Sequence, residues 1–416
     1  MERLADLDII RNMKDTDFYQ QILGVEAPWK VAAVRIEMDA RRVTVQIEVE
    51  PKAKWADPET GLAAHLHKWA ERRWRHLDTC QFETIIEARV PFVRHADGRV
   101  EEVAVPWADR YQRVTRLLAR AVIVWLQACG NVDQVARIMR LDWSTVDSIM
   151  KAAVARGLTR REAQPVENVG LDEKSFRRGH VYASMLNDLD NNRVWDLVEG
   201  RKTENAERLL ETLGEEQRSG VKAVAMDMWP AFEAAAREKL PQADIVYDKF
   251  HISAYLNKAV DDVRKQEHRE MTAKGRDTLK GSKYLWLRNF PDLRSEPSFR
   301  ELYSTTLKTS RAWRLKESFA GFWDYRYRGA AEKFFRDWHT KVKRSRLEPL
   351  KKVAEMLDNR IEGVLNYLKH RITNAASEGM NSLVARVVAN ARGLRSFATF
   401  RIRVLFFLGK LDLSIA

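Results

Sequence analysis

The order of strand-like and helix-like segments between residues 166 and 255 constrains the fold of this chain more than any other feature. Apolar runs bounded by short polar turns indicate strands, whereas apolar residues that recur at three- and four-residue intervals indicate helices. The segments in chain order are strands at 166–176, 180–189 and 193–199, a helix at 203–213, a strand at 221–228, a helix at 230–240 and a strand at 244–247. This order predicts an α/β fold for the middle of the chain.

Three strands followed by helix, strand, helix and strand match the plan of an RNase H-like core. That plan places the first and fourth strands side by side, so we expect Asp172 on the first and Asp227 on the fourth to lie close together. Asp227 follows five residues of which four are apolar, so its carboxylate lies at a buried strand that otherwise excludes charge. Two carboxylates this close repel each other unless divalent cations lie between them.

A third acidic residue completes the pattern. Two aspartates on strands and a glutamate on a late helix can hold two Mg²⁺ ions for phosphodiester chemistry. The glutamate is Glu378, because from His370 onward only Glu378 and Asp412 are acidic, against seven Arg and Lys. Carboxylate oxygens suit Mg²⁺ or Mn²⁺ as ligands. We predict that Asp172, Asp227 and Glu378 are the catalytic and metal-binding residues, although any one of them alone could be a helix cap or a surface residue.

Two other acids lie near this pattern. Glu173 should point to the opposite face of its strand from Asp172, because side chains alternate along a strand. Asp248 stands three residues before His251, a spacing that brings a carboxylate and an imidazole together where a strand passes into a helix. Helix capping or partial burial is the alternative role for His251. Asp248 and His251 are therefore predicted as auxiliary site residues.

Before the core, the period of the apolar residues changes to that of helices. One stripe consists of Val114, Leu117, Leu118, Ala121, Val122 and Trp125. A second helix begins at Val132 and a third near Ser144, which is a plausible N-cap. Short helix, tight turn and helix is the helix-turn-helix plan, whose last helix enters the major groove of DNA. An ordinary three-helix bundle is the alternative.

The basic tail that follows the third helix favours the DNA-binding interpretation. The predicted DNA-binding residues are Ser144, Thr145, Ser148, Lys151, Arg156, Arg160 and Arg161.

Upstream of the helices, alternating runs at 30–37 and 42–49 predict a β-hairpin, and further strand-like pieces continue to Pro106. We divide the chain into a β-rich N-terminal module at 1–108, a helix-turn-helix domain at 109–162, a catalytic domain at 163–255 and 370–416, and a helical insertion at 256–369.

The charge of the chain favours a polyanionic partner. Lys and Arg number 72 against 59 Asp and Glu, which gives a formal net charge of +13 and a pI near 9.6. From Leu256 to Lys369 there are 27 basic and 16 acidic residues, so most of the excess lies in the insertion. The two cysteines cannot form a disulfide framework, and no apolar run is long enough to span a bilayer. We expect a cytoplasmic, nucleoid-associated protein with no membrane partner.

Several motifs together resemble the DDE transposases of bacterial insertion sequences of the ISL-three type. The motifs are Asn168-Val-Gly-Leu-Asp-Glu-Lys-Ser-Phe, Ala225-Met-Asp-Met-Trp-Pro, Tyr247-Asp-Lys-Phe-His, Ser377-Glu-Gly-Met-Asn, Ala391-Arg-Gly-Leu-Arg-Ser-Phe and Glu71-Arg-Arg-Trp-Arg-His-Leu-Asp-Thr. The resemblance runs through nearly the whole chain. It implies that Asp172, Asp227 and Glu378 are the metal-binding triad, and that Asp248 and His251 form a signature shared with related transposases. Trp313 and Trp323 in the insertion could support distorted bases or simply pack in a core.

The resemblance implies that about 51–108 is a degenerate zinc-finger-like region, because the chain departs from this family in one segment. Members carry a small zinc-binding module built on paired Cys-x-x-Cys ligands before the Glu71 motif, whereas residues 52–67 here contain no cysteine. His65, His67, Cys80 and His95 are the remaining candidate ligands. The sequence therefore leads us to expect that the module folds without zinc.

The resemblance implies a DNA transposase that binds the terminal inverted repeats of its own element, cleaves the ends and joins their 3′-hydroxyls to target DNA with two Mg²⁺ or Mn²⁺ ions. Its partner is double-stranded DNA, both element ends and target, and two ends held together imply a homodimer or a higher oligomer. One alternative is a catalytically silent, transposase-derived DNA-binding regulator. Another is an RNase H-like nuclease without strand transfer.

Overall fold

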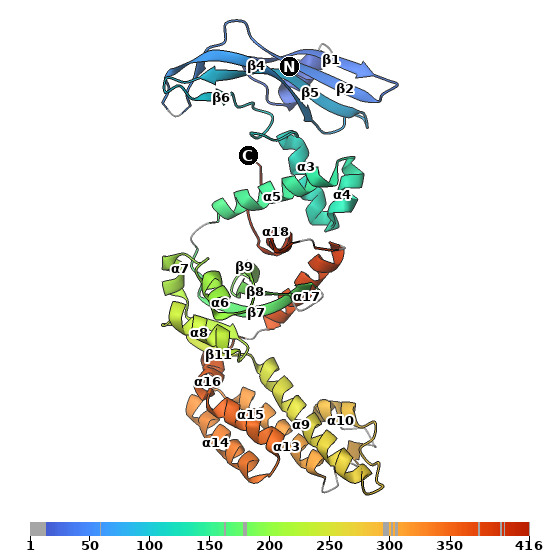
Figure 1. The fold of residues 1–416 in the computed structure, drawn as a ribbon, viewed down its shortest axis with the longest axis vertical. Coiled ribbons are helices and arrows are strands. Elements are labelled where there is room, and N and C mark those ends of the chain that lie inside the picture. Colours follow the sequence, from blue (N-terminus) through green and yellow to red (C-terminus); the bar gives the residue numbers. More distant parts are fainter. Residues whose placement is uncertain are drawn as a thin grey trace, which may run out of the picture. The chain divides into compact units, whose positions relative to one another are not determined.

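The computed structural model describes residues 14–58, 60–161, 164–177, 181–293, 299–300, 303, 307–372, 375–391, 393–394 and 396–415, without the side chains of Arg177, Pro291 and residues 375–378. The chain divides into two units, which Figure 1 traces from blue to red along the sequence. The first unit comprises Met1–Gly157 together with Asp412–Ala416, and the second comprises Leu158–Leu411.

A six-stranded sheet forms the N-terminal part of the first unit. Its strands are β1 (Trp29–Glu37), β2 (Arg42–Val49), β3 (Trp55–Ala56), β4 (Ala63–Arg75), β5 (Glu83–Arg94) and β6 (Val100–Glu102). They are arranged in the order β1-β2-β5-β4-β3, with β6 paired to β5. The antiparallel β1–β2 pair confirms the predicted hairpin. Helix α2 (Asp15–Ile22) packs against β1.

Tryptophans hold the interior of this sheet together. Trp107 packs edge to face against both Trp29 and Trp74, with ring centroids 5.2 and 5.4 Å apart. All three side chains are buried, which explains why tryptophans are spread over this short module.

Three helices follow the sheet, as the sequence predicts: α3 (Arg116–Cys129), α4 (Val132–Met139) and α5 (Trp143–Thr159). The side chains of Thr115 and Asn131 cap α3 and α4 by accepting backbone hydrogen bonds, and Gly130 ends α3 with a φ of 67°. The predicted cap at Ser144 is wrong. The Asp142 carbonyl accepts from the N–H groups of Thr145 and Val146, so α5 starts at Trp143 and Ser144 lies in its first turn.

The second unit is built on a five-stranded sheet. Its strands are β7 (Asn168–Arg177), β8 (Val181–Asp188), β9 (Arg193–Glu199), β10 (Ala223–Met226) and β11 (Asp244–Tyr247). The order β11-β10-β7-β8-β9 places the first and fourth strands of the unit side by side, as predicted. Strands β7, β10 and β11 are parallel, whereas β8 and β9 pair antiparallel to their neighbours. The unit therefore has the mixed α/β architecture that the order of its segments indicates.

Helices pack on this sheet and connect its strands. They are α6 (Thr203–Leu210), α7 (Glu215–Gly220), α8 (Pro230–Lys239), α17 (Ala375–Asn390) and α18 (Phe397–Leu408). Helix α6 contacts β8, β9 and α8, whereas α17 contacts β7 and α18 contacts β9. Phe176 on β7 stacks on Phe400 of α18, with ring centroids 4.9 Å apart. The short helix α7 had no periodic signal in the sequence analysis.

The segment between β11 and α17 is helical, as predicted, and begins seven residues earlier than the expected boundary at residue 256. It comprises α9 (Lys249–Thr272), α10 (Lys283–Leu287), α11 (Phe290–Leu293), α13 (Lys308–Ala320), η1 (Gly321–Asp324), α14 (Arg328–Arg344), α15 (Glu348–Asp358) and α16 (Ile361–His370). Trp313 is 1% exposed and donates its indole N–H to the Arg288 carbonyl. Trp323 is partly buried against the same core. Core packing is therefore the role of both side chains.

The end of the chain differs from the expected division, because residues 412–415 belong to the first unit. Arg120 donates to the Ile415 carbonyl at 2.8 Å, and Arg156 donates to the Ser414 carbonyl at 2.8 Å. These two hydrogen bonds join the C-terminal residues to helices α3 and α5 of the three-helix region. Among the described helices, none combines the length and apolarity that a membrane span requires.

Helix α16 returns from the insertion and packs tightly against the edge strand β11. The Asn366 amide donates to the Ile245 carbonyl at 3.0 Å, which satisfies an acceptor of the edge strand. A Cβ at Gly363 would lie 2.4 Å from Cε2 of Tyr247. Only glycine at position 363 permits this approach.

We predict that Gly363→Ala destabilises the second unit. The added methyl group must displace the buried Tyr247 ring, and such overpacking costs roughly 1–3 kcal/mol, less the helix propensity that alanine gains. Urea unfolding followed by circular dichroism should show a lower midpoint. Gly329→Ala in α14 is the matched control, because a Cβ there meets nothing within 4 Å and should leave the midpoint unchanged or raised. Equal midpoints for wild type and Gly363→Ala would contradict the packing argument.

A buried histidine makes the stability of the first unit depend on pH. His76 is 4% exposed, and its Nδ1 lies 2.9 Å from Oγ1 of Thr115, the cap of α3. Burial lowers the pKa of His76 from 6.5 to about 4. The unfolded chain therefore binds a proton that the folded chain excludes, so stability falls as pH drops from 6.5 toward 4, by up to about 3 kcal/mol.

We predict that His76→Asn, which lacks the titrating group, shows a shallower loss of unfolding free energy between neutral pH and pH about 5 than the wild type. Urea titrations of both proteins at each pH measure the difference. Parallel pH dependences in the two proteins would refute this assignment.

Candidate active site

The acids predicted from the sequence lie at the same level of three adjacent parallel strands. In the β7–β10 register, Asn168 pairs with Ala223 and Gly170 with Ala225, so the same register continued by two residues aligns Asp172 with Asp227. In the β10–β11 register, Met226 pairs with Tyr247, so Asp227 and Asp248 follow their strands together. Parallel pairing thus gathers Asp172, Asp227 and Asp248 at one edge of the sheet.

Asp172 is the most constrained of these side chains. Its Oδ1 accepts the Glu173 N–H at 2.7 Å, and its Oδ2 accepts a short hydrogen bond from the Asn381 amide of α17. Burial raises the pKa of Asp172, while these hydrogen bonds and the nearby His251 oppose the rise. A buried carboxylate with a raised pKa binds a cation readily, because the cation replaces the lost solvation.

Asp227 lies just after β10 and is about one third exposed. Its Oδ1 accepts the Met228 N–H at 2.6 Å, and its backbone carbonyl accepts the Trp229 N–H at 2.7 Å. Tyr255 of α9 is also near this carboxylate. Burial raises the pKa of the Tyr255 hydroxyl, and the charge of Asp227 raises it further.

His251 lies between two of the acids. Its Nδ1 is 3.5 Å from Oδ2 of Asp227, and its Nε2 is 3.9 Å from Oδ2 of Asp248. Asp248 is fully buried and caps α9 by accepting the Phe250 N–H at 3.0 Å. The predicted pairing of carboxylate and imidazole is therefore present, and Asp248 has the additional role of starting the helix that carries His251 and Tyr255.

The third predicted acid, Glu378, belongs to α17, but its side chain lies outside the described residues. Position 378 precedes Asn381 by three residues, the spacing of neighbours on one helix face. Among the side chains that the structure describes, no three His, Cys, Asp or Glu form a group that could hold a metal ion. Asp172 and Asp227 offer carboxylate oxygens, which are ligands that Mg²⁺ and Mn²⁺ prefer, and the His251 imidazole lies 3.5 Å from Asp227.

The neighbouring acid Glu173 has a partner of its own. Its Oε2 lies 3.4 Å from Nη1 of Arg201, in the loop between β9 and α6. Arg201, Tyr255 and Asn381 were not predicted from the sequence as site residues. Of these, only Asn381 had a signal, because it lies three residues after Glu378 within the quoted motif.

The predicted DNA-binding residues fall into two groups. Ser144, Ser148 and Lys151 are exposed along one face of α5, and Thr145 is partly exposed. The guanidinium of Arg156, in contrast, donates hydrogen bonds to the carbonyls of Leu413 and Ser414. Arg161 lies over the Trp195 ring at 4.3 Å, and burial lowers its pKa to about 10. Arg160 is exposed at the surface.

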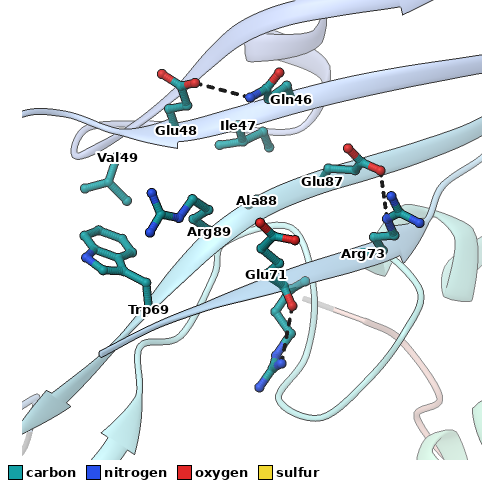
Figure 2. Close-up of a pocket in the computed structure, with 11 residues that line it drawn as sticks. Gln46, Ile47, Glu48, Val49, Trp69, Glu71, Arg73, Glu87, Ala88 and Arg89 are labelled. Atoms are coloured by element: carbon teal, nitrogen blue, oxygen red, sulfur yellow. Dashed lines mark hydrogen bonds and ion pairs between the residues drawn. The ribbon is translucent and has the colours of Figure 1, made fainter. Parts of the chain in front are cut away.

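A groove of about 460 Å³ on the first sheet is a different kind of site (Figure 2). Its charges balance, with three arginines against three glutamates: Arg72, Arg73, Arg89, Glu48, Glu71 and Glu87. Arg73 pairs with Glu87 at 2.8 Å, and Arg89 lies over the Trp69 ring at 5.6 Å. The formal charges that line this groove sum to zero, so it has no net attraction for a metal ion or a phosphate. We therefore assign the chemistry to the second unit.

Comparisons with known families agree with this division. A model of the ISL3 DDE domain, described as a transposase, matches residues 169–404, more than half of the chain. The helix-turn-helix domain of transposase family ISL3 matches residues 103–154, which include α3, α4 and most of α5.

One expectation about cofactors is corrected. The zinc-finger of transposases IS204, IS1001, IS1096 and IS1165 matches residues 53–94, so the expectation that zinc plays no part in this module is wrong. In the described residues, Asp57 lies 3.2 Å from Nδ1 of His95, whose Nε2 is 3.7 Å from Glu101. His65 and His67 are exposed, and no described group of three ligands forms there.

Curated relatives cover nearly the full chain. The chain is 29% identical to the transposase for insertion sequence element IS1001 of Bordetella parapertussis, over 87% of this chain and 91% of that protein. It is 24% identical to the transposase for insertion sequence element IS1557 of Mycobacterium tuberculosis, over 92% of this chain and 93% of that protein. With the ISL3 transposase model spanning the acid-bearing strands, the chain belongs to the ISL3 family of insertion-sequence transposases.

Proposed function

We propose that this chain binds the terminal inverted repeats of its own element, cleaves DNA at the ends and joins the 3′-hydroxyls to target DNA. The observation that carries the proposal is the register of β7, β10 and β11, which aligns Asp172 and Asp227 at one edge of the sheet. In this proposal Asp172, Asp227 and Glu378 hold two Mg²⁺ or Mn²⁺ ions. When bound, such ions activate a water or a 3′-hydroxyl and stabilise the leaving oxygen.

The surrounding side chains would orient the two described carboxylates. Asn381 holds one oxygen of Asp172, and the Glu173 N–H holds the other. The Met228 N–H holds Asp227. These donors fix the carboxylates without neutralising them, so both remain acceptors for a cation or for a proton from the attacking group. His251, within 4 Å of Asp227, is the group that could accept and return a proton.

DNA recognition is proposed for the exposed face of α5. Ser144, Thr145, Ser148 and Lys151 would contact bases or phosphates in the major groove, and Arg160 a neighbouring phosphate. The contacts of Arg156 and Arg161 within the protein remove these two residues from the proposed interface. Because two element ends must be joined in one event, we propose that a homodimer or a higher oligomer assembles on DNA.

We predict that Asp227→Asn abolishes cleavage of labelled element ends in Mg²⁺ while leaving end binding and its dependence on salt almost unchanged. The neutral amide keeps the shape of the side chain but cannot balance the charge of a metal ion. Asp262→Asn in α9, a partly exposed acid that pairs with Lys265, is the matched control and should cleave like the wild type. Cleavage by Asp227→Asn would show that the site is assigned to the wrong residues.

The same incubation with added plasmid separates the three candidate functions. A transposase yields products in which the labelled end is joined to plasmid, a nuclease yields cut ends alone, and a silent regulator yields bound DNA without cleavage. Only joined products support the function proposed here.

We predict that Lys151→Ala weakens DNA binding and lowers the slope of log affinity against log salt by about one, because one phosphate contact is lost. Titrations by fluorescence anisotropy at several salt concentrations measure both quantities. Lys151 pairs with Asp147 at 2.7 Å. Lys222→Ala is the matched control, since this exposed lysine pairs with Glu167 at the same distance but stands before β10, at the other end of that strand from Asp227. An unchanged slope for Lys151→Ala would exclude α5 as the phosphate-binding helix.

A further inference from the structure

An arginine held between two aromatic rings lies beside the proposed active site. The guanidinium carbon of Arg201 is 4.2 Å from the centre of the Tyr182 ring and 5.4 Å from the centre of the Trp229 ring. Trp229 follows Asp227 by two residues, and its backbone N–H donates to the Asp227 carbonyl at 2.7 Å. The aromatic and cationic group is therefore attached directly to one of the proposed metal-binding residues.

The loop that carries Arg201 is rigidly built. Gly200 has a φ of 99°, and a Cβ there would lie 2.5 Å from Oδ1 of Asn205. Its N–H donates to the Tyr182 carbonyl at 2.8 Å, and its carbonyl accepts from Oγ of Ser184 at 2.9 Å. These contacts fix the backbone of Gly200, and they therefore fix where the next residue, Arg201, leaves the β9–α6 loop.

The same group leaves aromatic surface in contact with solvent. Trp229 is 40% exposed, although its indole Nε1 already donates to the Arg201 carbonyl at 3.4 Å. The side chain of Arg201 is 42% exposed and forms an ion pair with Glu173. The Nε1 of this indole already has a hydrogen-bond acceptor, so a ligand would gain binding free energy mainly by covering the apolar face of the ring. A neighbouring guanidinium adds cation–π attraction for a second planar group.

We propose that Trp229 and Arg201 form a binding site for an unpaired nucleotide of the DNA end, with its base stacked on the indole. Every base has a flat face that stacks on an aromatic ring, and the positive guanidinium suits a polyanion. A base within a duplex has both faces covered by its neighbours, so the ligand is a nucleotide that has left the stack. This inference rests on the proposed function, because it assumes that DNA reaches Asp227.

The test compares two DNA probes that differ only in their bases. One is a short duplex with a single-stranded thymidine tail, and the other carries an abasic tail of equal length. Anisotropy titrations are done in EDTA with the full chain, so that no cleavage occurs. The wild type should bind the thymidine tail about 5- to 150-fold more tightly than the abasic tail, the range expected for stacking of one base. Trp229→Ala should remove this preference.

Two further variants separate stacking from a role in bracing the loop. Trp229→Phe retains a ring but loses the bond to the Arg201 carbonyl, so it should keep most of the preference for the thymidine tail. Tyr284→Ala removes an aromatic side chain that is 73% exposed on α10 and should keep the full preference. The inference is overturned if the wild type has no preference, if Trp229→Ala retains it, or if Trp229→Phe loses it as completely as Trp229→Ala.

Failure of this inference can be told apart from failure of the proposed function. A chain that cleaves and joins DNA but binds both tails equally contradicts only the nucleotide site. A chain that prefers the thymidine tail but never cleaves element ends in Mg²⁺ contradicts only the proposed chemistry.

Discussion

Parallel pairing of β7, β10 and β11 is the constraint on which the rest of the second unit depends. The register of these strands brings acids from separate parts of the sequence to one edge of the sheet. Strand interiors such as Ala223–Met226 are fully buried, so the pairing is stabilised by apolar burial along the strands and carries the acids at their ends. The fold therefore provides the free energy that holds like charges together.

Hydrogen bonds from neighbouring groups lower the free-energy cost of bringing these acids together. Asp172 receives hydrogen bonds from Asn381 and from the Glu173 backbone, and Asp227 receives one from the Met228 backbone. His251 lies between Asp227 and Asp248. These groups come from β7, the residue after Asp227, α9 and α17, so segments far apart in the chain must pack on the sheet before the site exists. The close contact of Gly363 with Tyr247 and the bond from Asn366 to β11 secure one such return.

Sequence reasoning succeeded where the signal is local. Alternation predicted the β1–β2 hairpin, helical periodicity predicted α3 to α5, and the order of segments predicted that β7 and β10 are neighbours. It failed where geometry depends on one or two atoms. The cap of α5 is at Asp142 because its carbonyl, rather than the Ser144 side chain, accepts the first hydrogen bonds. It also failed on zinc, since counting cysteines alone could not recognise a segment that matches the zinc-finger model.

The sequence by itself identified the acids of the proposed site, because Asp172, Asp227 and Asp248 each occupy or follow a run of residues that is predicted to be a strand. Tertiary structure decided what surrounds them. No pattern in the chain marks Tyr255 or Arg201, and Asn381 is marked only by its place after Glu378 in one motif. Asn381 contacts Asp172, and Arg201 contacts Glu173, only because α17 and the β9–α6 loop pack on the sheet. Likewise, Arg156 and Arg161 are basic residues in the sequence, but their partners decide that they hold the protein together. Periodicity reports what a segment buries, whereas contacts between distant segments depend on the packed fold.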